Sequence, residues 1–328
     1  MRRLNLLFSV LMLVVLVAMV LPGAAFAADP STKPVKIYLV AHCACSWDAF
    51  WCPVEKASRD AAKDLGVDVT LLTTETFNPE ETAQNVDKAL AAKPDAIGVS
   101  VTDGKMFQEP MMRAIKSGIP VIAYNAADWR PKAERIPYAT YIGQDEYAGG
   151  YKGAQLMLST YKDAKAGVCV NQAVGHTGLD ARCAGFTDAL KEANIKAEVL
   201  AITNEPNESS KIIEDYHTAH PDVNLWMTLG PNGAVPYYAF LDRAGLKPAE
   251  IHHGTFDLSP QILKKIGEDV TLFGVDQQPY LQGYQVVQYL TWMVRYGLKP
   301  ASDVVATGPN LITKADVPKL TELAGTYR

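Results

Sequence analysis

The sequence predicts an α/β protein of two lobes, each built on a doubly wound parallel sheet. Short β-branched runs alternate with amphipathic stretches along nearly the whole chain, and this alternation restarts once near the middle. About 300 residues follow an N-terminal leader, which is enough for two cores. No low-complexity linker separates the two series, so we expect short crossing strands to join the lobes.

The first βα series occupies residues 35–124. Strands are expected at residues 35–40, 67–72, 96–100 and 119–124, and helices at residues 50–65, 79–92 and 106–117. Val54, Ala57 and Ala61 share one stripe of the first helix, and Gly66 ends it. Strands that alternate with helices in this way need crossover connections, which predicts a parallel sheet.

The second series follows a helix around Gly149-Gly150. Strands are expected at residues 167–171, 197–202, 223–229, 251–256 and 270–275, and helices at residues 179–193, 209–219, 234–244, 260–267 and 280–296. We expect one lobe to comprise residues 34–143 plus 278–306, and the other residues 144–277 plus 307–328. The crossing strands are expected near Gly143-Gln144, Asp276-Gln277 and Ala306-Thr307.

The first 27 residues are typical of a cleaved signal peptide. Arg2 and Arg3 form a positive n-region, residues 6–20 are an apolar run, and Ala25-Phe26-Ala27 is a small-x-small cleavage site. The apolar run has about 15 residues, whereas a membrane-spanning helix needs roughly 20. No later stretch is long and apolar enough to cross a bilayer, so we expect a soluble, exported protein.

Net charge argues against a nucleic-acid partner. Cleavage of the leader removes two arginines and no acidic residue, so the net charge moves from −5 to −7. The remaining chain has no run of Lys and Arg, and nucleic-acid binding needs a basic patch.

Polar side chains gather directly after the predicted strands. In open α/β sheets, ligands bind outside the carboxyl ends of the strands. Two lobes that face each other across such ends form a cleft. The residues concerned are His42, Ser100, Asp103, Asn125, Asn171, Asp257 and Gln277.

No recognisable catalytic motif accompanies these residues. The glycine-rich run at residues 98–106 is not a phosphate loop, because five residues rather than four separate its glycines and Met106 replaces the magnesium-binding hydroxyl. His252 and His253 are adjacent on a strand and point to opposite faces, so they do not form a chelating pair.

The five cysteines fit an oxidising compartment. Cys169 and Cys183 bracket a strand-to-helix segment, and we expect them to form a disulfide that closes about 15 residues. In the N-terminal group, Cys52 is expected to pair with either Cys43 or Cys45, which leaves one thiol. A metal site built from this group and the neighbouring histidine is the weaker alternative.

Residues 35–312 resemble the ribose-binding-like group of bacterial periplasmic sugar-binding proteins. The segment DAFWCPVEKASRDAAKDLGVDV is similar to the family's first strand–loop–helix unit. The segments KPDAIGVSVTDG and AIKSGIPVIAYN are similar to its third and fourth βα units. The segment CVNQAVGHTGLDARCAGF is similar to the first unit of the family's second lobe. The segments TFDLSPQ and GVDQQPYLQGYQ are similar to its last strands and the crossover. The resemblance implies the type I fold of these proteins, in which a three-segment hinge joins two doubly wound lobes.

The resemblance also implies which residues bind the ligand. Phe50 and Trp51 fall on the family's aromatic pair, and Arg182 falls on the arginine before its Gly-Phe pair. Matched position by position, the implied set is Asp48, Phe50, Trp51, Ser100, Asp103, Asn125, Asn171, Arg182, Asn232, Asp257 and Gln277.

Some of these residues have a structural alternative. Asp103 is suited to cap the following helix, and Gln277 to stabilise the hinge. Phe50 and Trp51 begin a helix and are also suited to the core. Ala126 stands where ribose binders carry a second arginine, so ribose itself is not expected.

These residue types suit a sugar. Aromatic rings match its C–H faces, while carboxylates, arginine and amides match its hydroxyls. The resemblance implies a monomeric periplasmic protein that binds a sugar or polyol, without cofactor or metal, and delivers it to the permease of an ABC importer. A binding protein that serves a chemoreceptor or sensor kinase is the alternative, and a secreted α/β enzyme a remote one.

Overall fold

Two six-stranded sheets organise the part of the chain that the computed structural model describes, residues 29–328. The short helix η1 (Pro30–Thr32) precedes them in the chain, and the unit Pro34–Arg328 contains both sheets. The predicted signal peptide, residues 1–27, lies outside the described residues. No helix within residues 29–328 is both long and apolar enough to cross a bilayer.

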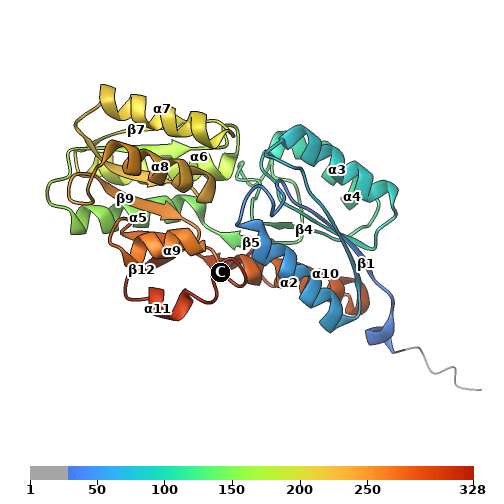
Figure 1. Cartoon of the computed structure of the whole chain (residues 1–328). Helices are drawn as coiled ribbons and strands as arrows, with labels where there is room; N and C mark the ends of the chain where they lie inside the picture. The colour runs from blue at the N-terminus through green and yellow to red at the C-terminus, as the bar shows by residue number, and fades with distance from the viewer. Residues whose placement is uncertain (1–28) are drawn as a thin grey trace, which may run out of the picture. The chain divides into compact units, whose positions relative to one another are not determined.

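The first sheet has the strand order β11-β5-β4-β3-β1-β2, and every neighbouring pair is parallel. Helices α2 and α10 pack on one face and α3 and α4 on the other (Figure 1). Because both faces are covered, its central strands are apolar throughout. The elements are β1 (Lys36–Val40), α2 (Trp51–Leu65), β2 (Asp68–Leu72), α3 (Pro79–Ala91), β3 (Ala96–Val99), α4 (Gly104–Lys116), β4 (Val121–Tyr124), β5 (Tyr141–Gln144), α10 (Pro279–Tyr296) and β11 (Val304–Gly308).

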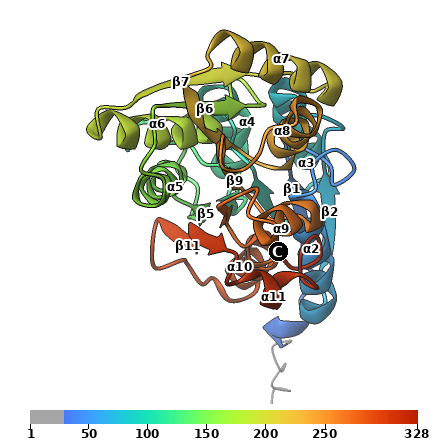
Figure 2. The ribbon, with the colours of Figure 1, turned by 60° about the vertical axis from the view of Figure 1, so that its left-hand side comes forward.

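The second sheet repeats this arrangement with the order β12-β10-β9-β8-β6-β7. Helices α5 and α6 pack on one face, and α7, α8 and α9 on the other (Figure 2). The elements are α5 (Glu146–Thr160), β6 (Ala166–Asn171), α6 (Thr177–Glu192), β7 (Lys196–Ala201), α7 (Pro206–Ala219), β8 (Val223–Thr228), α8 (Pro231–Ala244), β9 (His252–Phe256), α9 (Pro260–Gly267), β10 (Phe273–Asp276), β12 (Asn310–Thr313) and α11 (Val317–Leu320). Two doubly wound lobes are therefore confirmed.

One strand departs from the expected parallel pattern. β12 pairs with β10 in the antiparallel sense. It follows β11 after only Pro309, and β11 belongs to the first sheet. A connection this short leaves no room for the crossover helix that a parallel strand requires, so β12 enters the second sheet as an antiparallel edge strand.

The chain passes between the sheets three times. β5 lies in the first sheet and β6 in the second, with α5 between them. β10 lies in the second sheet, and the following α10 packs against α2, β3 and β4 of the first. The step from β11 to β12 is the third passage.

Helix α4 begins at Gly104, two residues before the expected start. Asp103 is its N-cap: its Oδ1 accepts hydrogen bonds from the backbone N–H of Lys105 at 2.7 Å and of Met106 at 3.0 Å. These bonds satisfy two of the donors that a helix start leaves without an intrahelical partner. The structural alternative for Asp103 is thereby confirmed.

Two glycines allow α5 and α6 to touch. A Cβ atom on Gly150 would lie 1.9 Å from the carbonyl oxygen of Arg182, and one on Gly185 would lie 2.1 Å from that of Tyr147. Any side chain at either position would force the helices apart. This close contact matters for the site, because it sets the distance between the start of α5 and the middle of α6.

Two disulfides are present among the described residues. The expected Cys169–Cys183 bond is confirmed and joins β6 to α6. In the N-terminal group the partner of Cys52 is Cys45, and Cys43 is a buried free thiol.

Loss of the Cys169–Cys183 bond is expected to lower the free energy of unfolding by about 3 kcal/mol, because the unfolded chain would regain the freedom of a loop of about 15 residues. The test is urea and thermal unfolding of a Cys169→Ser, Cys183→Ser double variant against the native protein. A loss below about 1 kcal/mol would contradict the entropic account.

Candidate functional site

A cavity lies where the carboxyl ends of strands from both sheets meet. Its wall includes the residues that directly follow β4, β6, β8, β9 and β10. Seven residues of the predicted set line it: Asp48, Phe50, Trp51, Asn125, Arg182, Asp257 and Gln277.

Asn125 and Asp257 occupy equivalent positions in the two sheets. Asn125 follows β4 with φ 62°, and Asp257 follows β9 with φ 64°. Among residues with a Cβ atom, Asn and Asp enter this left-handed region most readily. The backbone therefore turns sharply at both strand ends, and each side chain is placed on the cavity wall.

A chain of hydrogen bonds links the two lobes beneath the cavity. Ser100 Oγ donates to Asn125 Oδ1 at 3.3 Å, and Asn125 Nδ2 donates to Gln277 Oε1 at 3.5 Å. Gln277 Nε2 then donates to Asp257 Oδ1 at 2.6 Å. The two amides each accept at the oxygen and donate at the nitrogen, and Asp257 ends the chain as an acceptor, so the chain fixes the orientation of both amides.

His42 begins this chain. Its Nδ1 lies 2.8 Å from Ser100 Oγ, and because Ser100 donates its own proton to Asn125, His42 donates here. Burial and the nearby positive charge of Arg182 lower the pKa of His42 to about 3, so the ring is neutral. His42 also lines the cavity.

Arg182 is held by a buried ion pair with Glu146. Arg182 Nε and Nη2 lie 2.7 and 3.2 Å from the two carboxylate oxygens, and Nη1 donates to the carbonyl oxygen of Leu229 at 2.7 Å. The guanidinium also lies over the ring of Phe256, 4.3 Å from its centre. Burial opposes its charge, but Glu146 and Asp257 outweigh that effect and raise the pKa of Arg182.

The carboxyl groups of the wall are strongly desolvated. Burial raises the pKa of Asp257 to about 7, although Arg182 and the hydrogen bond from Gln277 partly oppose this shift. Burial also raises the pKa of Asp48. Both groups would be stabilised as carboxylates by new hydrogen-bond donors in the cavity.

Two polar atoms of cavity-lining side chains are buried without a hydrogen-bond partner in the described structure. They are the indole N–H donor of Trp51 and the amide oxygen of Gln172. Leaving such a group unpaired costs about 1–3 kcal/mol, and nearly all buried polar groups in folded proteins are paired. The wall therefore offers one unmet donor and one unmet acceptor to a bound molecule.

Phe50 and Trp51 serve the core and the cavity together. Both rings belong to the cluster that packs α2 and α10 on the first sheet, and both line the cavity. The Trp51 ring makes edge contacts with His42 and Phe50, with centroids 4.9 and 5.4 Å apart. The two interpretations of this aromatic pair are thus compatible.

Four residues of the predicted set do not line the cavity. Asp103 caps α4, and Ser100 lies behind Asn125 in the hydrogen-bond chain. Asn171 is occupied by Asp180 and by the backbone N–H of Ala173. Asn232 lines a separate hollow that shares Trp47 with the cavity.

Other residues of the site have no individual signal in the sequence. Glu146 stands two residues after a crossing strand, which was the only available hint. His176 caps α6 by accepting from the backbone N–H of Gly178 at 3.1 Å. The remaining additions to the wall include Trp47, Phe77 and Gln172.

The two lobes touch beside the cavity, so the structure is a closed arrangement. The backbone N–H and the hydroxyl of Thr177, at the start of α6, both donate to the carbonyl oxygen of Thr102, at 3.0 and 2.9 Å. The ring of the preceding residue, His176, stacks on that of Phe77 with centroids 5.6 Å apart. These contacts join loops that extend from different sheets.

The structure gives no support to the metal alternative. Residues 29–328 contain no group of three His, Cys, Asp or Glu side chains arranged to hold a metal ion. Two of the cysteines considered for that site, Cys45 and Cys52, are bonded to each other.

Two α/β lobes that enclose a small polar cavity define the class of two-lobed solute-binding proteins. Residues 44–297 match the profile of the periplasmic binding protein domain, and the chain belongs to this family. Members of the family bind solutes outside the cytoplasm and are not enzymes.

Known relatives agree with this assignment. The xylose/arabinose-binding protein XylF of Sulfolobus acidocaldarius is 26% identical over 274 residues, which are 80% of this chain and 67% of that protein. A carbohydrate transporter protein of Acidothermus cellulolyticus 11B, solved with myo-inositol, is 27% identical with a TM-score of 0.80 over 89% of this chain and 99% of that one. A periplasmic sugar-binding protein of Legionella pneumophila is 28% identical with a TM-score of 0.78 over 84% and 99% of the two chains.

Proposed function

We propose that this protein binds a neutral monosaccharide or polyol in the cavity and delivers it to the permease of an ABC importer. The observation that carries the proposal is the composition of the closed wall. Buried carboxyl, guanidinium and amide groups surround the cavity, and the Trp51 donor and the Gln172 acceptor have no partner among residues 29–328. A guest that pairs these groups must both donate and accept hydrogen bonds at several points.

A hydroxyl group meets this requirement, because it donates one hydrogen bond and accepts up to two. The carboxyl oxygens of Asp48 and Asp257 accept hydrogen bonds from the ligand hydroxyls. The Trp51 indole N–H, together with the N–H groups of Arg182 that Glu146 and Leu229 do not use, donates hydrogen bonds to the ligand. The Phe50 ring offers an apolar surface for the C–H face of a sugar. A ligand that lacks a hydroxyl leaves one of these groups unpaired, at a cost of about 1–3 kcal/mol.

The charges of the site favour a neutral guest over an acidic one. Asp48, Asp257 and Glu146 contribute three carboxyl groups, whereas Arg182 is the guanidinium that faces them. Burial lowers the pKa of His42 to about 3, so this ring adds no positive charge. Arg182 already forms a two-point pair with Glu146, which leaves it poorly placed to neutralise a carboxylate on a sugar.

The relatives support this ligand class. The Sulfolobus protein is described as binding xylose and arabinose, and the Acidothermus protein was solved with myo-inositol. Another solved neighbour, from Agrobacterium radiobacter and 25% identical, holds D-arabinose. Pentoses and inositol are both small and rich in hydroxyl groups, which suits the polar wall of the cavity.

Delivery of the ligand to the permease depends on a difference in ligand affinity between an open and a closed form of the protein. A ligand held by both lobes binds the closed form better than an open form, and so shifts the population toward closure. The closed form is then the one a permease would recognise. The signal-peptide pattern of residues 1–27 supports a periplasmic location for this cycle, and we propose that the mature protein acts there as a monomer.

The test is isothermal titration against D-xylose, L-arabinose, D-arabinose, D-glucose, D-galactose and myo-inositol, with D-galacturonate as the acidic comparison. We expect at least one neutral compound to bind with a Kd of about 10 μM or tighter, and the acid to bind at least about 100-fold more weakly. Small-angle scattering should show compaction on addition of the neutral ligand. Absence of heat and of compaction with every compound would contradict the proposal.

A further inference from the structure

The segment between β1 and α2 carries much of the cavity wall but has no regular structure. We call residues 44–50 the aromatic loop. Trp47, Asp48 and Phe50 of this loop line the cavity, and Trp51 follows it as the first residue of α2. The aromatic side of the site thus depends on a segment that belongs to neither a strand nor a helix.

Hydrogen bonds hold the aromatic loop mainly to itself. The backbone N–H groups of Trp47 and Asp48 both donate to the carbonyl oxygen of Ala44, and Asp48 Oδ1 accepts from the N–H of Phe50 at 3.0 Å. The remaining hydrogen bonds of the loop go to helix α2: the N–H groups of Trp51 and Cys52 donate to the carbonyl oxygens of Asp48 and Ala49, and Cys45 N–H donates to Glu55 Oε1 at 3.1 Å. Local bonds of this kind do not fix where the loop lies relative to the sheet.

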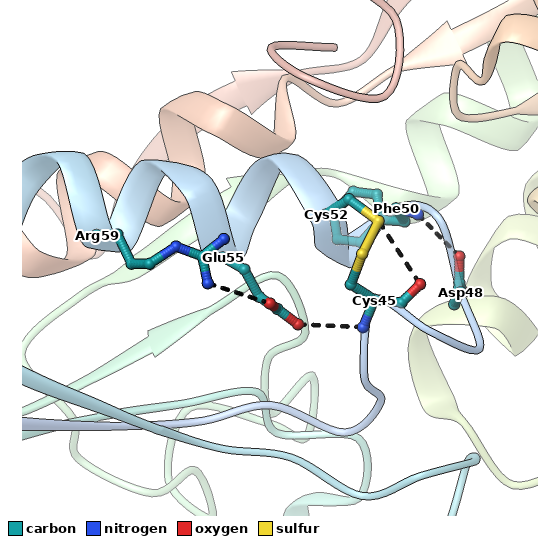
Figure 3. Close-up of a disulfide and its surroundings, with 6 residues drawn as sticks. All are labelled: Cys45, Asp48, Phe50, Cys52, Glu55 and Arg59. Carbon is teal, nitrogen blue, oxygen red and sulfur yellow. Dashed lines mark hydrogen bonds and ion pairs between the residues drawn. A yellow bond between two sulfur atoms is a disulfide. The ribbon is translucent and has the colours of Figure 1, made fainter.

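The Cys45–Cys52 disulfide adds a covalent tether between the loop and the helix. It joins the start of the aromatic loop to the first turn of α2, and its two cysteines are seven positions apart in sequence (Figure 3). Glu55, which accepts from Cys45, lies in the next turn of the same helix (Figure 3). Helix α2 is itself anchored on the first sheet through Val54 and Ala61. Phe50 at the end of the loop packs in the same core cluster, and the disulfide fixes the start of the loop to the anchored helix.

We propose that the Cys45–Cys52 disulfide is a positioning element for ligand binding, which holds Trp47, Asp48 and Phe50 in the ligand-competent arrangement before any ligand arrives. This inference rests on the proposed function of the cavity. Without the bond, the loop of the ligand-free protein samples many conformations, and ligand binding must order it. That ordering opposes binding, so a loop ordered in advance gives a tighter complex.

A comparison of two disulfide knockouts tests the proposal. The first variant is Cys45→Ser with Cys52→Ser; both sulfurs are removed so that the buried thiol of Cys43 has no new partner. The matched control is Cys169→Ser with Cys183→Ser, which removes the disulfide of the first βα unit of the other sheet. Its cysteines lie in β6 and α6, which keep their own backbone hydrogen bonds.

Two measurements distinguish positioning from general stabilisation. For the tightest binder in the sugar panel, we expect the first variant to lose at least about tenfold in Kd, with a less favourable binding entropy, and the control to stay within about threefold. In the ligand-free proteins, amide hydrogen exchange at residues 44–51 should be at least about tenfold faster in the first variant and unchanged in the control. Both variants should unfold at lower temperature, so unfolding temperature alone does not discriminate.

Equal Kd values for the first variant and the native protein would overturn the proposal, as would unchanged exchange at residues 44–51. An equal loss of affinity in both variants would also overturn it, because the effect would then be global. If the native protein binds no compound of the panel, the proposed function fails by itself. The exchange measurement then still decides whether the bond orders the aromatic loop.

Discussion

Replacement of Asp257 by Asn is expected to weaken ligand binding by about 100-fold while it stabilises the ligand-free protein at pH 8. The carboxylate of Asp257 keeps one oxygen for a ligand after accepting from Gln277, and a charge-assisted hydrogen bond contributes about 1.5–3 kcal/mol. The amide of Asn preserves shape but presents a weaker acceptor or a donor in its place. Titration calorimetry with the tightest panel ligand measures the loss.

The stability effect of this variant has a definite pH dependence. The pKa of Asp257 is about 7 in the folded protein, raised by burial from an ordinary value of 3.8. Between these two pH values the folded state holds a proton that the unfolded state has lost, so stability falls as pH rises from 4 to 7 and stays reduced above 7. A shift of one pKa unit corresponds to about 1.4 kcal/mol. Relaxation of the protein around the buried charge reduces this cost, so we expect a loss of about 1–3 kcal/mol in the free energy of unfolding between pH 4 and pH 8.

Unfolding of the native protein and of Asp257→Asn at pH 4, 6 and 8 checks this sign. The two proteins should differ little at pH 4, and the variant should be the more stable at pH 8. Gln277→Glu is an informative comparison, because it adds a carboxyl group 2.6 Å from Asp257 and should destabilise at high pH. A variant that is less stable than the native protein at pH 8 would show that the Arg182 attraction outweighs burial.

Replacement of Arg182 by Ala is expected to destabilise the protein by about 3–5 kcal/mol and to abolish ligand binding. The change leaves the carboxylate of Glu146, whose side chain is 2% exposed, without its cation. It also removes the donor to the carbonyl oxygen of Leu229 and the packing over Phe256. Urea unfolding of the ligand-free protein measures the first effect, and calorimetry the second.

A double variant separates folding from binding at this pair. Arg182→Met combined with Glu146→Gln removes both charges and keeps an amide oxygen that still accepts from Gln144. Because a buried ion pair is often replaced by neutral residues at little cost, we expect this variant to regain most of the stability but not the affinity. Recovery of binding would mean that Arg182 acts only as a structural partner of Glu146.

The site was predictable where it follows strand ends. Asn125, Asp257 and Gln277 each come directly after a predicted strand, and parallel strands bring their carboxyl ends to the same edge of a sheet. The aromatic pair Phe50 and Trp51 was predictable from the resemblance. Asp103 shows the limit of this rule, because a polar residue after a strand also precedes a helix and can cap it.

Glu146 and His176 were not predictable, because their roles depend on contacts between elements that are far apart in sequence. Glu146 reaches Arg182 only because α5 and α6 approach closely at Gly150 and Gly185. His176 joins the site by packing on Phe77 of the other lobe. No local pattern records how closely two helices pack or where two lobes meet.

The amino-acid sequence by itself determined the two βα series, the strand-end positions of the polar residues and the Cys169–Cys183 pairing, because these depend on hydrophobic periodicity and short separations along the chain. Only the tertiary structure decided the partner of Cys52, the antiparallel edge strand and the burial of the Arg182–Glu146 pair. These features depend on distances between separately folded elements, and such distances are set by packing across the whole molecule.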